Sequence, residues 1–198
     1  MKTGKKTTTG LLFGSFNPIH TGHLIIAQHM LAFEGLEAVW FVVSPQNPLK
    51  TGDQLLPEHL RLELVNLALE KNSRFSPCDM ELQMGTPSYT IRTLKKLSEA
   101  YPEREFVLLI GSDNLAVFDQ WKDYREIMDM IQILVYPRPG TKGRPPVSHP
   151  HITRVKAPLL EISSSHIRRM VGQGKDPRYL LPEKVYERII RESYYRNY

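Results

Sequence analysis

The sequence predicts an α/β fold in which a doubly wound parallel sheet forms the middle of three αβα layers. Apolar runs rich in β-branched and aromatic residues recur along the chain, and segments with helical spacing of apolar residues separate them. Turns that contain glycine or proline follow several of these runs. Strands and helices that alternate in this way are typical of a parallel sheet with helices on both faces.

The first half of the chain contains three predicted strands. Residues 9–16 form an apolar run that meets a glycine-rich turn, and residues 24–31 then follow helical spacing. Residues 37–44 form a second run, which turn-forming residues end before a long loop. Proline favours the first turn of a helix over residues 57–70, and we expect residues 75–81 to form a short third strand.

The second half continues the alternation. Its most hydrophobic run, residues 104–113, follows a predicted helix that begins at Pro87 or Ser88, and we expect this run to be a central strand. Proline, glycine and positive charge in residues 138–151 predict a mobile loop. The remaining predicted elements are a strand over residues 131–137, an extended stretch over 152–162 and helices over 163–171 and 182–193.

Length, composition and charge limit the class of protein. With 198 residues, 41% of them hydrophobic, we expect one domain over residues 10–198 after a flexible basic head over residues 1–9. No apolar run has the length of a membrane span or a signal peptide core, and the single Cys78 suits a reducing compartment, so we expect a cytoplasmic protein with no membrane partner. The net charge of +5 favours anionic partners, but dispersed Lys and Arg predict no nucleic-acid partner. A homo-oligomer stays open.

Polar motifs follow the predicted strands. GSFNP ends the first strand, SPQNPLK the second and GSDN the fourth, whereas SSSHIR begins a late helix. In a doubly wound sheet, ligands bind beyond the carboxyl ends of the strands. We therefore expect these distant motifs to share one rim of the sheet.

Residues 14–23, GSFNPIHTGH, form the most specific of these motifs. Gly14 allows the backbone to approach a ligand closely, and His20 and His23 can face one point from the start of a helix. Imidazole N–H groups, backbone N–H groups and the helix dipole then favour an anionic triphosphate. A pair of histidines at this spacing also suggests a metal site, but the motif lacks the glutamate of HExxH, and we expect no protein-bound metal.

Three other rim residues offer suitable chemistry. Asp113 follows a buried strand and can accept hydrogen bonds from hydroxyl groups. Serines at the start of the late helix supply donors, with Arg168 one turn further, although a serine-capped surface helix is the alternative. Lys50 can supply a cation to phosphate, with a solvated loop lysine as the alternative.

The string GSFNPIHTGH resembles the (T/H)xGH signature of the nucleotidyltransferase superfamily. Over roughly residues 10–191 the chain resembles the family of bacterial nicotinate-nucleotide adenylyltransferases, because PSYTIRTL, IGSDNLAVFDQW and EISSSHIRRM resemble further motifs of that family. The resemblance implies a Rossmann-like nucleotidyltransferase fold. One departure is SPQNPLK, where the family has a longer loop and Leu49 stands in place of a histidine.

The resemblance also implies two adjacent ligand sites. The resemblance implies that Thr90 holds the pyridine carboxylate, with a helix cap as the alternative role. It also implies that Trp121 lies against the pyridine ring, with a core residue as the alternative. The implied catalytic residues are His20, His23, Lys50 and Arg168. The implied ATP site contains Gly14, Ser15, Phe16, His20, Gly22, His23, Gly111, Asp113, Ile162, Ser163, Ser164 and Arg168. The implied mononucleotide site contains Ser15, Phe16, Thr90, Asp113 and Trp121.

The reaction implied by the resemblance joins ATP and nicotinate mononucleotide. The phosphate of the mononucleotide attacks the α-phosphorus of ATP in line, which releases pyrophosphate and forms deamido-NAD. The expected cofactor is Mg²⁺, carried mainly by ATP. The alternatives are the same chemistry on nicotinamide mononucleotide or another acceptor, a nucleotide-binding sensor without turnover, and an RNA-binding basic domain.

Overall fold

A six-stranded parallel sheet forms the centre of the structure, a computed structural model that describes residues 6–45, 55–141 and 146–198. The strand order is β3-β2-β1-β4-β5-β6, and every pairing is parallel. Because the order reverses between β1 and β4, the predicted doubly wound sheet is confirmed. The strands are β1 Thr7–Gly14, β2 Ala38–Val43, β3 Phe75–Cys78, β4 Arg104–Gly111, β5 Gln132–Tyr136 and β6 Ile152–Arg154.

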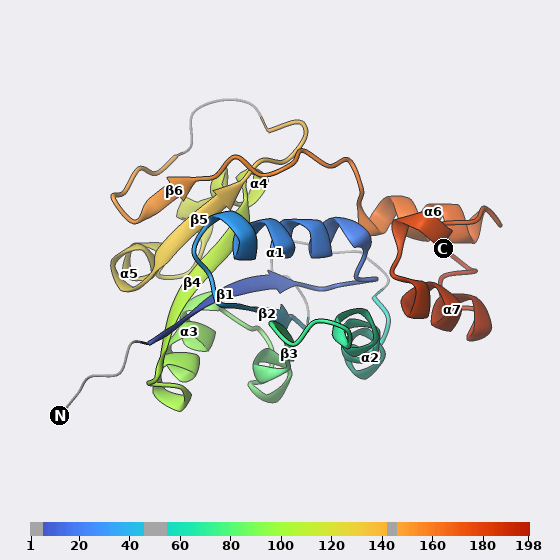
Figure 1. The fold of residues 1–198 in the computed structure, drawn as a ribbon, viewed down its shortest axis with the longest axis horizontal. Helices are drawn as coiled ribbons and strands as arrows, with labels where there is room; N and C mark the ends of the chain where they lie inside the picture. The colour runs from blue at the N-terminus through green and yellow to red at the C-terminus, as the bar shows by residue number, and fades with distance from the viewer. Residues whose placement is uncertain (1–5, 46–54, 142–145) are drawn as a thin grey trace.

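Helices cover both faces of the sheet (Figure 1). Because side chains alternate across a strand, Leu11 and Leu12 of β1 enter two different hydrophobic clusters. Helices α1, α2, α6 and α7 contribute to the cluster around Leu12, and α3, α4 and α5 to the cluster around Leu11. The helices are α1 Thr21–Phe33, α2 Glu58–Leu69, α3 Thr90–Ala100, α4 Ser112–Leu115, α5 Tyr124–Met130, α6 Ser164–Gly172 and α7 Glu183–Arg191.

The first strand begins earlier than the sequence predicts. Thr7 pairs with Arg104 of β4, and Thr9 is fully buried. The hydroxyl of Thr9 accepts a hydrogen bond of 3.0 Å from the Arg104 guanidinium. The expected flexible head over residues 1–9 is therefore wrong from Thr7 onward, because threonines that look like a polar tail are satisfied by pairing in the sheet.

Short helices account for the other differences. The hydrophobic pattern did not predict α4, α5 or the 3₁₀ turn Phe118–Gln120, because such short elements contain too few periodic positions. The third predicted strand ends at Cys78, and Met80–Gln83 form another 3₁₀ turn. The predicted mobile loop over residues 138–151 lies partly outside the described residues.

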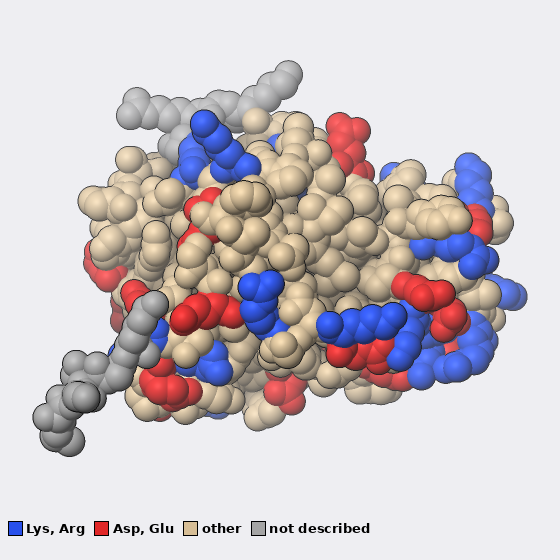
Figure 2. All heavy atoms as spheres, viewed as in Figure 1, with Lys and Arg blue, Asp and Glu red and all other residues tan. Residues whose placement is uncertain are grey.

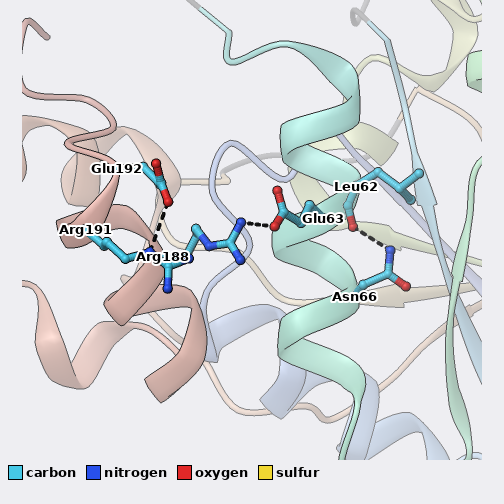
Figure 3. A network of polar contacts seen from close by, with 6 residues as sticks. All are labelled: Leu62, Glu63, Asn66, Arg188, Arg191 and Glu192. Atoms are coloured by element: carbon cyan, nitrogen blue, oxygen red, sulfur yellow. Dashed lines mark hydrogen bonds and ion pairs between the residues drawn. The ribbon is translucent and has the colours of Figure 1, made fainter.

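Charged side chains join α7 to α2. Arg188 of α7 pairs with Glu63 of α2, as Figure 3 shows, and Lys184 pairs with Glu70 at 2.5 Å. The same surface has interspersed positive and negative side chains in Figure 2. Exposed pairs of this kind each contribute only about 0.2–1 kcal/mol. Their main effect is to set how the C-terminal helix lies on α2, whereas apolar residues such as Val185 provide its buried face.

Candidate active site

A cavity of about 550 Å³ opens at the carboxyl ends of the central strands. Its wall includes Gly14 of β1, Ile110 of β4 and Tyr136 of β5. This position is the switch point of the sheet, where doubly wound folds bind ligands. The predicted site residues that line the cavity are Gly14, Ser15, Phe16, His20, His23, Thr90, Asp113, Trp121, Ser163, Ser164 and Arg168.

The other predicted site residues lie elsewhere. Gly22 and Ile162 line a second, very small cavity of about 10 Å³, which shares His20 and His23 with the large one. Gly111 ends β4 behind the wall, where a Cβ atom would come within 2.8 Å of Cγ of Arg138. Its lack of a side chain therefore allows Arg138 to lie close to the end of the strand. Lys50, together with Leu49, lies outside the described residues.

The turn after β1 has a backbone that brings Phe16 inward. Phe16 has a φ of 45°, in the left-handed region, and its side chain is 2% exposed. A Cβ atom on Gly14 would lie 3.1 Å from the Phe16 ring, so glycine suits this position. The same ring contacts His23 edge to face, with centroids 5.1 Å apart. The turn therefore places a buried aromatic ring behind the histidines.

His20 and His23 are held against each other at the start of α1. Their rings stack with centroids 3.7 Å apart, and the backbone N–H of His20 donates to Nδ1 of His23 at 3.2 Å. Because Nδ1 accepts this hydrogen bond, a neutral His23 carries its proton on Nε2. The Nε2–H group is thus the donor that His23 can offer to a bound phosphate.

Burial lowers the pKa of both histidines. In His20, which is 2% exposed, burial is the main cause and the charge of Arg138 the second, and together they lower the pKa to about 3. In His23, burial, His20 and Arg138 hold the pKa well below 6.5. Both imidazoles are therefore neutral near pH 7 and provide N–H donors, so positive charge in the cavity must come from other side chains.

The free energy of unfolding should decrease as the pH falls below about 6.5. The pKa of His20 is near 3 in the folded protein and 6.5 when unperturbed, so the unfolded state binds this proton first. The stability that neutral His20 contributes is complete above pH 6.5 and is lost as the pH falls toward 3. His20 alone should account for about 2 kcal/mol between pH 7 and pH 5. Urea denaturation at these two pH values would measure it.

A matched pair of variants isolates this effect. His20→Gln should reduce the difference in unfolding free energy between pH 7 and pH 5, and His29→Gln should keep it. His29 lies on the same helix, contacts the Phe33 ring at a tilt and does not line the cavity. If the free energy of unfolding of His20→Gln changed with pH as much as that of the unaltered protein, protonation of His20 would not be the cause of the pH dependence.

The start of α6 meets the turn after β1. Ser163 caps the helix by accepting a hydrogen bond of 3.2 Å from the backbone N–H of His166. Ser164 Oγ donates to the carbonyl of Pro18 at 2.9 Å, and the Arg168 guanidinium donates to the carbonyl of Asn17 at 2.8 Å. The expected convergence of the first and last motifs is thus confirmed, and α6 lies beside the start of α1 in Figure 1. Arg168 is 2% exposed, which excludes a simple surface helix.

The opposite wall of the cavity carries the aromatic residues. Trp121 lies in this wall and packs against Phe118, with ring centroids 5.0 Å apart. Thr90 is the first residue of α3, but Tyr89 occupies the cap position, so Thr90 does not serve as the cap. Both residues are partly exposed and line the cavity.

Arg138 and Lys122 are wall residues that the sequence analysis missed. Arg138 follows β5, and its Nε lies 3.9 Å from Oδ1 of Asp113. Its backbone N–H donates to Ser112 Oγ at 2.9 Å. The signal was present, because Arg138 comes directly after the predicted strand over residues 131–137. Assigning it to a mobile loop concealed its place at the rim.

Arg61 of α2 is a buried support that the sequence analysis also missed. Its side chain is fully buried, and the guanidinium donates to the carbonyls of Ser15 at 2.6 Å, Ser44 at 2.7 Å and Pro45 at 2.8 Å. These carbonyls belong to the segments that follow β1 and β2. A single arginine therefore joins two segments that reach the cavity.

Carboxylates at the cavity are few. Asp113 and the buried Glu81 line it, and Glu81 accepts a hydrogen bond of 2.8 Å from Thr93 Oγ1. Within residues 6–45, 55–141 and 146–198, no three His, Cys, Asp or Glu side chains gather closely enough to hold a metal ion.

A cavity at the switch point that is lined by neutral imidazoles, the buried Arg168, the partly exposed Arg138 and aromatic rings fits an enzyme that joins two nucleotides. The chain belongs to the cytidylyltransferase-like family, whose model matches residues 11–170.

Two curated relatives define its place within the family more narrowly. The chain is 50% identical over 188 residues to the probable nicotinate-nucleotide adenylyltransferase of Bacteroides fragilis, covering 95% of this chain and 94% of the relative. It is 47% identical over 196 residues to the protein of the same name from Bacteroides thetaiotaomicron, covering 98% and 97%. A solved structure of Plasmodium falciparum nicotinic acid mononucleotide adenylyltransferase complexed with NaAD shares the fold, with a TM-score of 0.78, 18% identity, and coverage of 97% of this chain and 98% of that chain.

Proposed function

We propose that this protein is an adenylyltransferase that transfers AMP from ATP to nicotinate mononucleotide, forming deamido-NAD and pyrophosphate in NAD biosynthesis. The observation that carries the proposal is that one cavity of about 550 Å³ is lined by the histidine turn and Arg168 and also by Thr90 and Trp121. The names of relatives that are 47–50% identical over nearly the whole chain support the same activity.

The histidine wall is suited to the triphosphate. Nε2–H of His23 and the first backbone N–H groups of α1 are donors, and the helix dipole adds partial positive charge. Arg168 and Arg138 bring full positive charge to the same wall. Because the phosphate of the mononucleotide attacks the α-phosphorus directly, the protein needs only to align the reactants and stabilise the charge that develops on pyrophosphate.

Mg²⁺ is the cofactor that we propose, and it would neutralise phosphate charge when bound with ATP. Asp113 is a carboxylate that lines the cavity, and its Oδ1 lies 3.9 Å from Nε of Arg138. It could contribute one ligand, and the oxygens of the nucleotide would provide most of the others.

The aromatic wall is suited to the pyridine nucleotide. Trp121 offers a ring face for stacking, and the hydroxyl of Thr90 can donate to a carboxylate. Lys122 lies beside them, with Nζ 4.7 Å from the centroid of the Tyr89 ring. This positive charge favours an acid over an amide, which supports nicotinate as the acceptor.

Nicotinate mononucleotide should be the preferred acceptor. We expect its kcat/KM with ATP to exceed that of nicotinamide mononucleotide by about tenfold or more, since a lost charge-assisted contact has roughly this effect. Release of pyrophosphate with ATP and each mononucleotide would measure the preference. A higher kcat/KM for nicotinamide mononucleotide would overturn the choice of acceptor, and ATP binding without pyrophosphate release would favour the sensor.

We further propose that the reaction takes place in the cytoplasm, without a nucleic-acid or membrane partner. Positive side chains lie among negative ones on the face that Figure 2 shows and do not form one basic stripe. None of the described helices is long and apolar enough to span a membrane. A homo-oligomer stays open, and light scattering on the purified protein would determine the number of subunits.

A further inference from the structure

The residues after α7 fold back against the turn that carries the histidines. Tyr195 is buried, and its hydroxyl donates to Oδ1 of Asn17 at 2.9 Å. Asn17 is fully buried, and the same oxygen accepts a hydrogen bond of 3.1 Å from the backbone N–H of Leu56. Two donors use the two lone pairs of this amide oxygen. The orientation of the Asn17 side chain therefore depends on Tyr195.

The burial of Tyr195 suits it to be a donor. Desolvation is the main reason that its pKa is raised above the ordinary value for tyrosine, although the charges of Arg168 and Arg61 act in the opposite direction. The hydroxyl consequently keeps its proton near neutral pH. In the sequence, Asn17 lies between Phe16 and His20, which both line the cavity. A shift of Asn17 would therefore move both of these side chains.

Tyr198 makes a second contact, to Arg168. Its ring lies 4.3 Å from the carbon at the centre of the guanidinium, and its hydroxyl accepts a hydrogen bond from the same group. Tyr198 can lie here because Gly172 of α6 has no side chain; a Cβ atom at this glycine would come within 3.3 Å of the carbonyl carbon of Tyr198. Tyr198 thus covers the side of Arg168 that would otherwise face solvent.

The segment that carries both tyrosines is anchored from outside the cavity. Helix α7 leads into it and is joined to α2 by Arg188 and Glu63, shown in Figure 3. Figure 1 shows this segment next to α6 and α7, at the end of the sheet toward which β1 points. Neither Tyr195 nor Tyr198 lines the cavity, so any effect on a bound nucleotide must pass through Asn17 and Arg168.

We propose that Tyr195 and Tyr198 are positioning residues for the ATP half of the site. Tyr195 fixes the phosphate-binding turn through Asn17, and Tyr198 fixes the guanidinium of Arg168 by its ring and its hydroxyl. This inference rests on the proposed function, because it assumes that the turn and Arg168 hold the phosphates of ATP. In the mononucleotide half, Trp121 packs against Phe118, whereas the two tyrosines contact Asn17 and Arg168.

Isosteric variants separate the two contributions. Tyr195→Phe keeps the ring and removes the donor, and we expect the Kd for MgATP to rise about 3–10-fold, the usual effect of one hydrogen bond. Tyr198→Phe keeps the ring over Arg168 and should raise this Kd by about 2–3-fold, whereas Tyr198→Ala should raise it about tenfold. The KM for nicotinate mononucleotide should stay within about twofold of its value in the unaltered protein in all three variants. The reason is that these substitutions weaken binding only in the ATP half of the site.

The matched control is Tyr194→Phe. Tyr194 lies in the same segment and packs against the core, but its hydroxyl has no hydrogen-bond partner among the described residues. Calorimetric titration with MgATP, steady-state kinetics with both substrates and a thermal melt would be done on each variant. Measurements at a temperature well below every melting midpoint separate a change in positioning from partial unfolding.

Each outcome has a distinct meaning. A Kd for MgATP that is unchanged in Tyr195→Phe and in Tyr198→Ala, relative to Tyr194→Phe, overturns the inference and leaves the proposed function intact. Equal losses for ATP and for the mononucleotide also overturn it, because they indicate a general loss of structure. If the unaltered protein binds MgATP but forms no product, the proposed function fails, and the calorimetric comparison still tests the two tyrosines. If the unaltered protein does not bind MgATP, both fail.

Discussion

Replacing His23 by alanine should lower the turnover number by about 10²–10³-fold, a larger effect than the loss of its ring contacts has on the melting temperature. The reason lies in the hydrogen bond from the backbone N–H of His20 to Nδ1 of His23, which leaves the Nε2–H group of a neutral ring as a fixed donor. A donor that is already oriented before the reaction stabilises the charge on the departing pyrophosphate without reorganisation. Since charge increases there in the transition state, the loss should appear mainly in kcat.

Two further variants make this test specific. His23→Gln keeps an N–H donor at a similar distance along the side chain and should recover part of the turnover. His29→Ala, on the same helix but away from the cavity, should behave like the unaltered protein. Pyrophosphate release under saturating substrates would measure all three. If His23→Ala turned over at nearly the normal rate, the histidine turn would not be part of the catalytic machinery.

Replacing Arg168 by alanine should have a similarly large effect, about 10²–10³-fold in kcat/KM for ATP, together with a lower melting temperature. Arg168 combines two roles, because its guanidinium lines the cavity and also donates to the carbonyl of Asn17. The variant therefore removes a positive charge from the phosphate wall and leaves a buried carbonyl without this donor. The protein should lose both activity and stability.

A lysine at this position separates charge from geometry. Arg168→Lys keeps the charge but cannot bridge Asn17, Ser165 and the bound phosphates with one ammonium group, so we expect a partial loss of activity. Arg169→Ala is the control, since Arg169 is the next residue of the same helix but is exposed and does not line the cavity. Steady-state kinetics and a thermal melt would measure both properties. An equal effect of Arg168→Ala and Arg169→Ala would contradict a direct role for Arg168.

Much of the fold could be predicted from the sequence because its strands are strongly hydrophobic. Residues 104–113 and 131–137 were expected as strands, and β4 and β5 lie within them. The carboxyl ends of parallel strands meet at one edge, so the motifs after them could be assigned to one site without any coordinates. Eleven of the predicted site residues line the cavity, and Lys50 lies outside the described residues.

Other features depend on contacts between distant residues and could not be predicted from local patterns. Arg61 lies on an ordinary amphipathic helix, and only the folded chain shows that its guanidinium binds the carbonyls of Ser15 and Ser44. In the same way, Thr7 looked like part of a polar tail until its pairing with Arg104 was visible. Short elements such as α5 have too few residues to give a periodic signal.

The sequence by itself determined which chemical groups are present at the rim: histidines after β1, Asp113 after β4 and Arg168 in α6. The tertiary structure decided the state and the support of those groups. Burial makes His20 and His23 neutral donors, Tyr195 reaches Asn17 across 178 residues of sequence, and Tyr198 reaches Arg168 across 30. The physical reason is that residue type and spacing are local properties, whereas pKa, desolvation and side-chain orientation depend on every neighbour that the fold brings into contact.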